Sequence, residues 1–161
     1  MCGIAGKVVF GGDGRVDEAL LARMADTLRH RGPDGIGRWT DGRAGLASTR
    51  LAVIDLSDRG RQPMASEDGR LRIVFNGEIY NFQDLRGDLE QRGHRFRSRT
   101  DTETILCLYQ EMGPGCLESL RGMFAFAIWD AVDQTLFLAR DRLGKKPLLY
   151  WCAGGRLSFA S

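Results

Sequence analysis

The first residue of this chain that could carry out chemistry is the cysteine directly behind the initiator methionine. Met1-Cys2-Gly3 leads into an apolar run, Ile4 to Phe10, that predicts a strand and would fix the start of the chain in a sheet. Without Met1, Cys2 would carry both a thiol and a free α-amine. An α-amine has an ordinary pKa of about 7.7–8.0, so it could serve as the base for the thiol beside it. A buried structural cysteine is the alternative reading of these residues.

Arg50 is the next candidate, because it lies inside the apolar segment 44–54, where we expect a strand. This segment follows a predicted hairpin turn at Asp41-Gly42. A buried arginine there would need an anionic partner, since an unpaired buried charge is costly. An outward-facing arginine on an alternating strand would need none, so both interpretations stay open.

Asn76-Gly77 ends a predicted strand that begins at Leu71, and a helix is expected to start near Asn81. Asn-Gly is often a plain hairpin turn, but here a helix follows it. The Asn76 amide and the unobstructed N–H of Gly77 are two hydrogen-bond donors at one strand end. Two such donors could form an oxyanion hole.

Thr100-Asp101-Thr102-Glu103 predicts the start of a helix that runs to Met112. Thr100 and Glu103 fit a capping box, in which each side chain binds the other residue's backbone N–H. Asp101 is left without a capping partner, although acidic residues favour helix starts in any case.

Further elements must position these side chains. A helix is expected over 16–28, and a strand over 94–99 with Phe96 turned inward. A charged loop, 140–147, separates the strands of a β-rich C-terminal part, which we expect at 123–129, 135–139, 147–152 and 156–159.

Composition narrows the class of protein. The 161 residues are 43% hydrophobic and 27% charged, as expected for one globular domain. A net charge of +2 gives no reason to expect a nucleic-acid or membrane partner, and neither a membrane span nor a signal peptide is evident. We therefore expect a cytoplasmic protein. Cys107, Cys116 and Cys152 are expected to pack in the interior, with no disulfides and no metal site.

Taken together, these motifs resemble the class II glutamine amidotransferase domain of glutamine-hydrolysing asparagine synthetases. Seven stretches match in the family's order and cover nearly the whole chain: Met1–Gly6, Arg31–Gly35, Arg50–Asp55, Gln62–Met64, Asn76–Asn81, Thr100–Glu103 and Arg140–Leu148. The resemblance implies one domain, residues 2–161, with an α+β N-terminal-nucleophile hydrolase fold. In this fold two antiparallel sheets form a four-layer αββα sandwich.

The resemblance also implies a role for each matching residue. Cys2 would attack L-glutamine and its own α-amine would be the base, while the Asn76 side chain and the Gly77 N–H would hold the oxyanion. The glutamine substrate would bind to Arg50 through its α-carboxylate and to Glu78 and Asp101 through its α-ammonium. The main chain of Leu51, Ala52, Val53 and Ile54 would line the same pocket. The reaction would release glutamate and ammonia.

In the family, the ammonia serves an ATP-dependent synthetase domain in the same parent chain, which makes asparagine from aspartate. This sequence stops at Ser161, directly after an apolar strand, so we expect it to be a truncated piece without that domain. ATP and Mg²⁺ are expected only there, and no cofactor in this chain. The full-length enzyme could be a homodimer. Two alternatives are a domain that serves an enzyme amidating another carboxylate and a non-catalytic scaffold domain.

Overall fold

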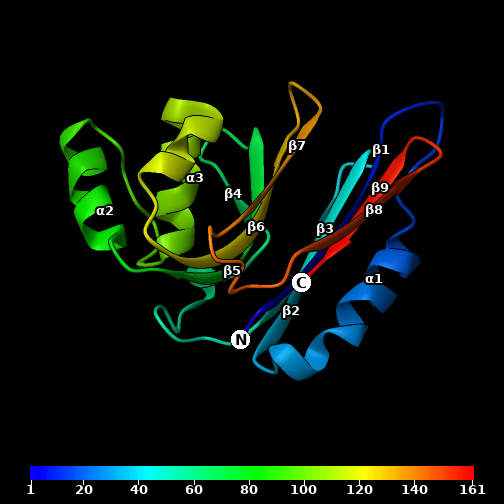
Figure 1. Ribbon diagram of the computed structural model, residues 1–161, viewed down its shortest axis with the longest axis horizontal. Coiled ribbons are helices and arrows are strands. Elements are labelled where there is room, and N and C mark those ends of the chain that lie inside the picture. The colour runs from blue at the N-terminus through cyan, green and yellow to red at the C-terminus, as the bar shows by residue number, and fades with distance from the viewer.

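In the computed structural model, which describes residues 1–161, the chain folds into two antiparallel sheets that face each other (Figure 1). The five-stranded sheet has the order β2-β3-β1-β9-β8 and the four-stranded sheet the order β4-β5-β6-β7. Their strands are β1 (Gly3–Val9), β2 (Gly35–Thr40), β3 (Ala44–Arg50), β4 (Met64–Ala65), β5 (Leu71–Ile79), β6 (Gly122–Asp130), β7 (Thr135–Arg140), β8 (Leu149–Ala153) and β9 (Arg156–Ala160).

Helices cover the two outer faces, as Figure 1 shows. The helix α1 (Glu18–Thr27) packs on the five-stranded sheet, whereas α2 (Phe82–Gln91) and α3 (Asp101–Met112) pack on the four-stranded one. Short 3₁₀ turns occupy Arg29–Arg31, Asp58–Gly60 and Gly113–Glu118. This is the predicted four-layer αββα sandwich. No helix in the structure is both long enough and apolar enough to cross a lipid bilayer.

Three apolar clusters hold the layers together. The largest lies between the four-stranded sheet and α3, with Ile73, Phe75 and Ile105 among its members. A second fills the space between the sheets, and a small one joins α1 to β3. Burial of this apolar surface is the main stabilising contribution to such a sandwich.

Most predicted elements are confirmed, but two strands end elsewhere than expected. The strand predicted over 44–54 stops at Arg50, because its neighbours β1 and β2 pair with it only as far as Thr49 and Arg50. The strand that was expected to end at Asn76-Gly77 continues to Ile79, because β6 pairs with it over all nine residues. Long-range pairing therefore outweighs the local turn signal of Asn-Gly.

The region before α3 also differs from the prediction. Residues 94–99 form no strand; instead, the backbone N–H groups of Arg97 and Ser98 donate to the Glu103 carboxylate at 2.9 and 2.7 Å. Thr100 caps the helix as predicted, since its Oγ1 accepts from the Glu103 N–H at 3.3 Å. The capping box also predicted a bond from the Thr100 N–H to the Glu103 carboxylate. This prediction is wrong, because that carboxylate accepts from Arg97 and Ser98 instead.

All four cysteines are free thiols. Cys107 and Cys116 are buried as expected, and burial raises the pKa of Cys107 to about 12 and that of Cys116 to about 11. The prediction that Cys152 packs in the interior is wrong, since it is exposed on the edge strand β8.

Candidate active site

The candidate residues gather at one end of the space between the two sheets. Side chains alternate along a strand, and even-numbered residues of β1, β3 and β5 point into this space. The apolar members of that set are Ile4, Val8, Ala44, Leu46 and Val74. Continuing the alternation brings Cys2, Arg50 and Asn76 to the same layer, where the interior changes from apolar to polar.

Asn76 is almost completely buried, at 1% exposure, and contacts the main chain of Cys2. In the amide orientation that matches donors with acceptors, Asn76 Nδ2 donates to the Cys2 carbonyl at 2.9 Å. Its Oδ1 accepts from Arg31 Nη2 at 3.2 Å, and Arg31 Nε also donates to the Cys2 carbonyl at 3.2 Å. These bonds use one of the two Nδ2 hydrogens, so a second donor remains beside Cys2.

The N–H of Gly77 is available because of the register of β5. Phe124 lies opposite Gly77, and it uses its own N–H and carbonyl for bonds to Asp141, away from β5. Gly77 therefore belongs to a pair without hydrogen bonds, and its N–H points to the open edge of β5. The N–H groups of Phe75 and Ile79 point the same way and donate to Gln62 Oε1 at 2.7 Å and Asp101 Oδ2 at 3.1 Å.

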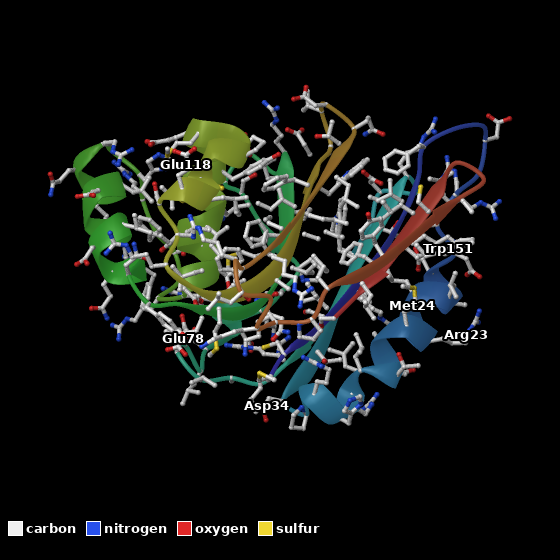
Figure 2. All side chains as sticks on the ribbon, viewed as in Figure 1. Arg23, Met24, Asp34, Glu78, Glu118 and Trp151 are labelled. Carbon is white, nitrogen blue, oxygen red and sulfur yellow. The ribbon has the colours of Figure 1, made fainter.

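The Cys2 thiol faces the main chain that follows β3. Its Sγ accepts from the Leu51 N–H at 3.4 Å and lies 3.7 Å from the Leu51 carbonyl. The next residue, Ala52, donates its N–H to Asp34 Oδ2 at 2.8 Å. Asp34 therefore fixes the segment against which the thiol rests. Figure 2 shows Asp34 and Glu78 on the lower side of the molecule, near the N-terminus marked in Figure 1.

Arg50 has no carboxylate partner within ion-pair distance. Its guanidinium instead donates to the carbonyls of Ser57, at 3.0 Å, and Asp55. The Asp55 carboxylate accepts from the Arg99 N–H and from Ser57, and these bonds lower its pKa to about 2. The loop after β3 thus closes around the Arg50 side chain and leaves its positive charge without a protein counterion.

One cavity of about 170 Å³ joins all these groups. Its lining includes every residue that the sequence singled out for catalysis or glutamine binding: Cys2, Arg50, Leu51, Ala52, Val53, Ile54, Asn76, Gly77, Glu78 and Asp101. Met1 and Lys146 also line it. No group of three or more His, Cys, Asp or Glu side chains lies close enough together to hold a metal ion.

Asp101 supplies a buried carboxyl group at this cavity. It is 4% exposed, and burial raises its pKa to about 6, although the N–H groups of Ile79 and Thr102 act to lower it. The negative charge of Glu78 adds to the increase. Asp101 is therefore ionised at neutral pH at a cost to the folded state.

Asp101→Asn is expected to raise the free energy of unfolding at pH 7, by about 1–2 kcal/mol. The folded-state pKa lies above the ordinary value of 3.8, so wild-type stability falls as pH rises from about 4 through about 6. Asparagine removes the charge and keeps an acceptor for the Ile79 N–H. Urea unfolding at several pH values measures the difference, which should vanish below about pH 4.

Asp88→Asn, on the exposed side of α2, is the matched control and should change stability little. An Asp101→Asn variant that is less stable than the wild type at pH 7 would contradict the assignment of an ionised, desolvated carboxyl.

The sequence reasoning missed the roles of two cations. No role was predicted for Arg31, yet its guanidinium donates to the Cys2 carbonyl and to Asn76 Oδ1. Lys146 was placed in a charged loop, yet it is buried at the cavity. Arg31 lies in the Arg31–Gly35 motif, which was the available signal, whereas nothing local in the sequence distinguishes Lys146 from Lys145.

Comparisons with known proteins agree with this geometry. The chain is 44% identical over 163 residues to glutamine-hydrolysing asparagine synthetase 3 of Bacillus subtilis, with 100% of this chain and 26% of that protein covered. It is 37% identical to a putative glutamine-hydrolysing asparagine synthetase of Methanocaldococcus jannaschii, covering 100% and 34%. Amidase chry2 of Gibberella zeae is 36% identical, with 100% and 26% covered. The chain thus spans about a quarter to a third of these relatives.

A solved structure shows the same fold. Glutamine phosphoribosylpyrophosphate amidotransferase from B. subtilis, complexed with ADP and GMP, superposes with a TM-score of 0.78 at 23% identity, over 99% of this chain and 41% of that one. The family described as "Glutamine amidotransferase domain" matches residues 1–161. With its N-terminal-nucleophile hydrolase fold, this chain belongs to the glutamine amidotransferase domain family.

Proposed function

We propose that this chain hydrolyses L-glutamine to glutamate and ammonia, with Cys2 as the nucleophile once Met1 has been removed. The observation that carries the proposal is the meeting of Cys2, Asn76 and Gly77 at one cavity. A nucleophile and two donors around one reacting centre are what acyl transfer requires.

The chemical step uses groups of one residue as nucleophile and base. The neutral α-amine of mature Cys2 takes the proton from Sγ, and the thiolate attacks the carboxamide carbon of glutamine. The carbonyl oxygen becomes an oxyanion, and the amine returns its proton to the leaving ammonia. Water then hydrolyses the thioester to glutamate and restores the thiol.

The second Nδ2 hydrogen of Asn76 and the N–H of Gly77 bind the oxyanion. The amide and the strand are held by Arg31 and by the pairing of β5 with β6, so both donors are in place before charge develops. Donors that need no reorganisation contribute most to the rate.

The charged groups of the cavity bind the non-reacting end of glutamine. Arg50 has only carbonyl partners and is free to pair with the α-carboxylate, while Glu78 and Asp101 receive the α-ammonium. The main chain of residues 51–54 lines the pocket beside them. Fixing a zwitterion with groups of both signs orients the carboxamide and selects glutamine over uncharged amides.

We propose that the released ammonia is used by an ATP-dependent synthetase domain that makes asparagine from aspartate. Matched relatives carry the name asparagine synthetase and extend well beyond the length of this chain. ATP and Mg²⁺ belong to that domain in this proposal. The edge strand β8 exposes Leu149, Tyr150 and Trp151, at 73%, 71% and 64%, and such an apolar patch suits contact with another domain.

Glutamate release from the chain beginning at Cys2 tests the proposal. We expect hydrolysis of glutamine without ATP or aspartate and no formation of asparagine, because the hydrolytic groups all lie in this chain. Mass spectrometry verifies that Met1 is absent. No release from a chain verified to begin at Cys2, or release only with ATP, would contradict a self-sufficient glutaminase site.

A further inference from the structure

Lys146 is a buried cation that the proposed reaction has not yet used. Of the three lysines in the chain it alone is buried, at 4% exposure. A lysine in this position is unusual, because lysines are almost never fully buried unless they are paired. None of the ion pairs in the structure includes it.

The backbone of Lys146 is fixed by Asp141. The Asp141 carboxylate accepts the N–H groups of Lys146, at 3.0 Å, and Lys145, at 2.9 Å, as well as that of Phe124 in β6. Although burial acts to raise it, these bonds hold the pKa of Asp141 below its usual value. The loop after β7 is thereby anchored so that Lys146, and not its exposed neighbour Lys145, enters the cavity.

The sole hydrogen-bond partner of Lys146 Nζ is Met1 Sδ. Five covalent bonds join Met1 Sδ to the backbone nitrogen of Cys2, so Nζ lies within roughly 10 Å of that nitrogen. Removal of Met1 deletes the partner of Lys146 and turns the same nitrogen into the α-amine of Cys2. The flexible lysine stem can then bring the ammonium closer to this amine.

The charges around the α-amine of Cys2 decide whether it is protonated or neutral. Glu78 and Asp101 line the same cavity, and their carboxylates favour a protonated, positively charged amine. A protonated amine cannot accept the thiol proton. A second cation beside the amine favours its neutral form, because two like charges at short range disfavour each other.

We propose that Lys146 is a positioning residue for this reaction: its ammonium offsets the carboxylates of Glu78 and Asp101 and keeps the α-amine of mature Cys2 neutral at physiological pH. The proposal rests on the glutaminase function proposed above. The proton moves as in that mechanism, from Sγ to the amine, and Lys146 neither gives nor takes one.

Other charged groups also face this part of the cavity from the elements packed around it. Those that line the cavity are Arg50 and Asp55 at the end of β3 and in the loop beyond, Glu78 from β5 and Asp101 from α3. Arg31 and Asp141 lie next to it, bonded to the Cys2 carbonyl and to the Lys146 N–H. All of them remain when Lys146 alone is replaced, so a difference in pH profile reports on Lys146.

The test follows kcat/KM for glutamate release from about pH 5.5 to 9.5, because this ratio reports the free enzyme, in which Glu78 and Asp101 have no substrate ammonium bound; Asp101 is the same in every variant compared. It uses the chain without Met1. The wild type should lose activity on acidification with a midpoint below about 7.7, the lower end of the ordinary α-amine range. Lys146→Met should raise this midpoint by about one pH unit, and the two rates should converge at high pH.

Lys146→Arg keeps the charge and should keep the midpoint, and Lys145→Met, which removes an exposed lysine from the same loop, should match the wild type. A Lys146→Met variant with lower activity at every pH but an unchanged midpoint would overturn the proposal. A wild-type midpoint at or above about 8 would overturn it as well, and this result needs no folded variant.

A second experiment distinguishes failure of the proposed glutaminase function from failure of the role of Lys146. A diazoketone analogue of glutamine should alkylate Cys2 in the wild type, in Lys146→Met and in Lys146→Arg. Absence of labelling at any pH in the wild type would refute Cys2 as the nucleophile, and the role of Lys146 with it. Labelling of all three proteins with one shared midpoint would refute only the role of Lys146.

Discussion

Cys2→Ala is expected to lower glutamate release to below about one thousandth of the wild-type rate. The substitution removes the only thiol at the cavity that Asn76 and Gly77 line, because no other cysteine lines it. The fold should persist, because the thiol makes only weak contacts with the Leu51 main chain. Coupled detection of glutamate measures the rate, and thermal unfolding checks the fold.

Cys152→Ala is the matched control, because Cys152 is exposed on β8 and lies outside the cavity. This variant should retain full activity. Mass spectrometry after treatment with the diazoketone analogue should place the label on Cys2 in the wild type and in Cys152→Ala. Labelling of Cys107, Cys116 or Cys152 in place of Cys2 would refute the assignment of the nucleophile.

Asn76→Ala is expected to lower kcat by about 10²–10³ and to change KM much less. The hydrogen bond from Asn76 Nδ2 to the carboxamide oxygen of glutamine becomes strong only when that oxygen becomes negative. Its removal therefore destabilises the transition state more than the bound substrate. Steady-state kinetics at the pH of maximal activity separate the two constants. A higher KM with an unchanged kcat would show that Asn76 only binds the substrate.

The same variant also loses the bonds from Asn76 to Cys2 and Arg31, so a control must separate catalysis from positioning. Alkylation of Cys2 by iodoacetamide forms no oxyanion. Its rate should therefore stay within about threefold of the wild type while kcat falls, because only acyl transfer uses the oxyanion hole. Equal losses in both reactions would assign Asn76 to the positioning of Cys2.

Local sequence patterns predicted much of this fold because the signals involved act over a few residues. The helix 101–112 was predicted with its observed bounds, since Thr100 caps its first turn. The strands of the C-terminal part were placed to within two residues at each end for a similar reason, as short turns join β6 to β7 and β8 to β9.

The candidate site was predicted by residue type and motif, and the structure brings those residues to one cavity. Arg50 shows where this reasoning was incomplete. An arginine in an apolar segment indicated a need for an anion, but the sequence could not show that two loop carbonyls would hold the guanidinium without neutralising it.

What the sequence determined by itself is therefore the set of chemical groups: a thiol that can lie next to an amine, an Asn-Gly pair of donors, and charges of both signs for a zwitterion. Their availability was decided by the tertiary structure. Gly77 has a free N–H only because β5 continues past it in a register that turns this group away from β6. Lys146 is buried beside Met1, and Lys145 is not, because Asp141 binds the loop's backbone N–H groups and is itself tied to Phe124 in β6. Strand register, and the bond from the Phe124 N–H in β6 that fixes Asp141, depend on partners far apart in the chain, and local patterns carry no information about them.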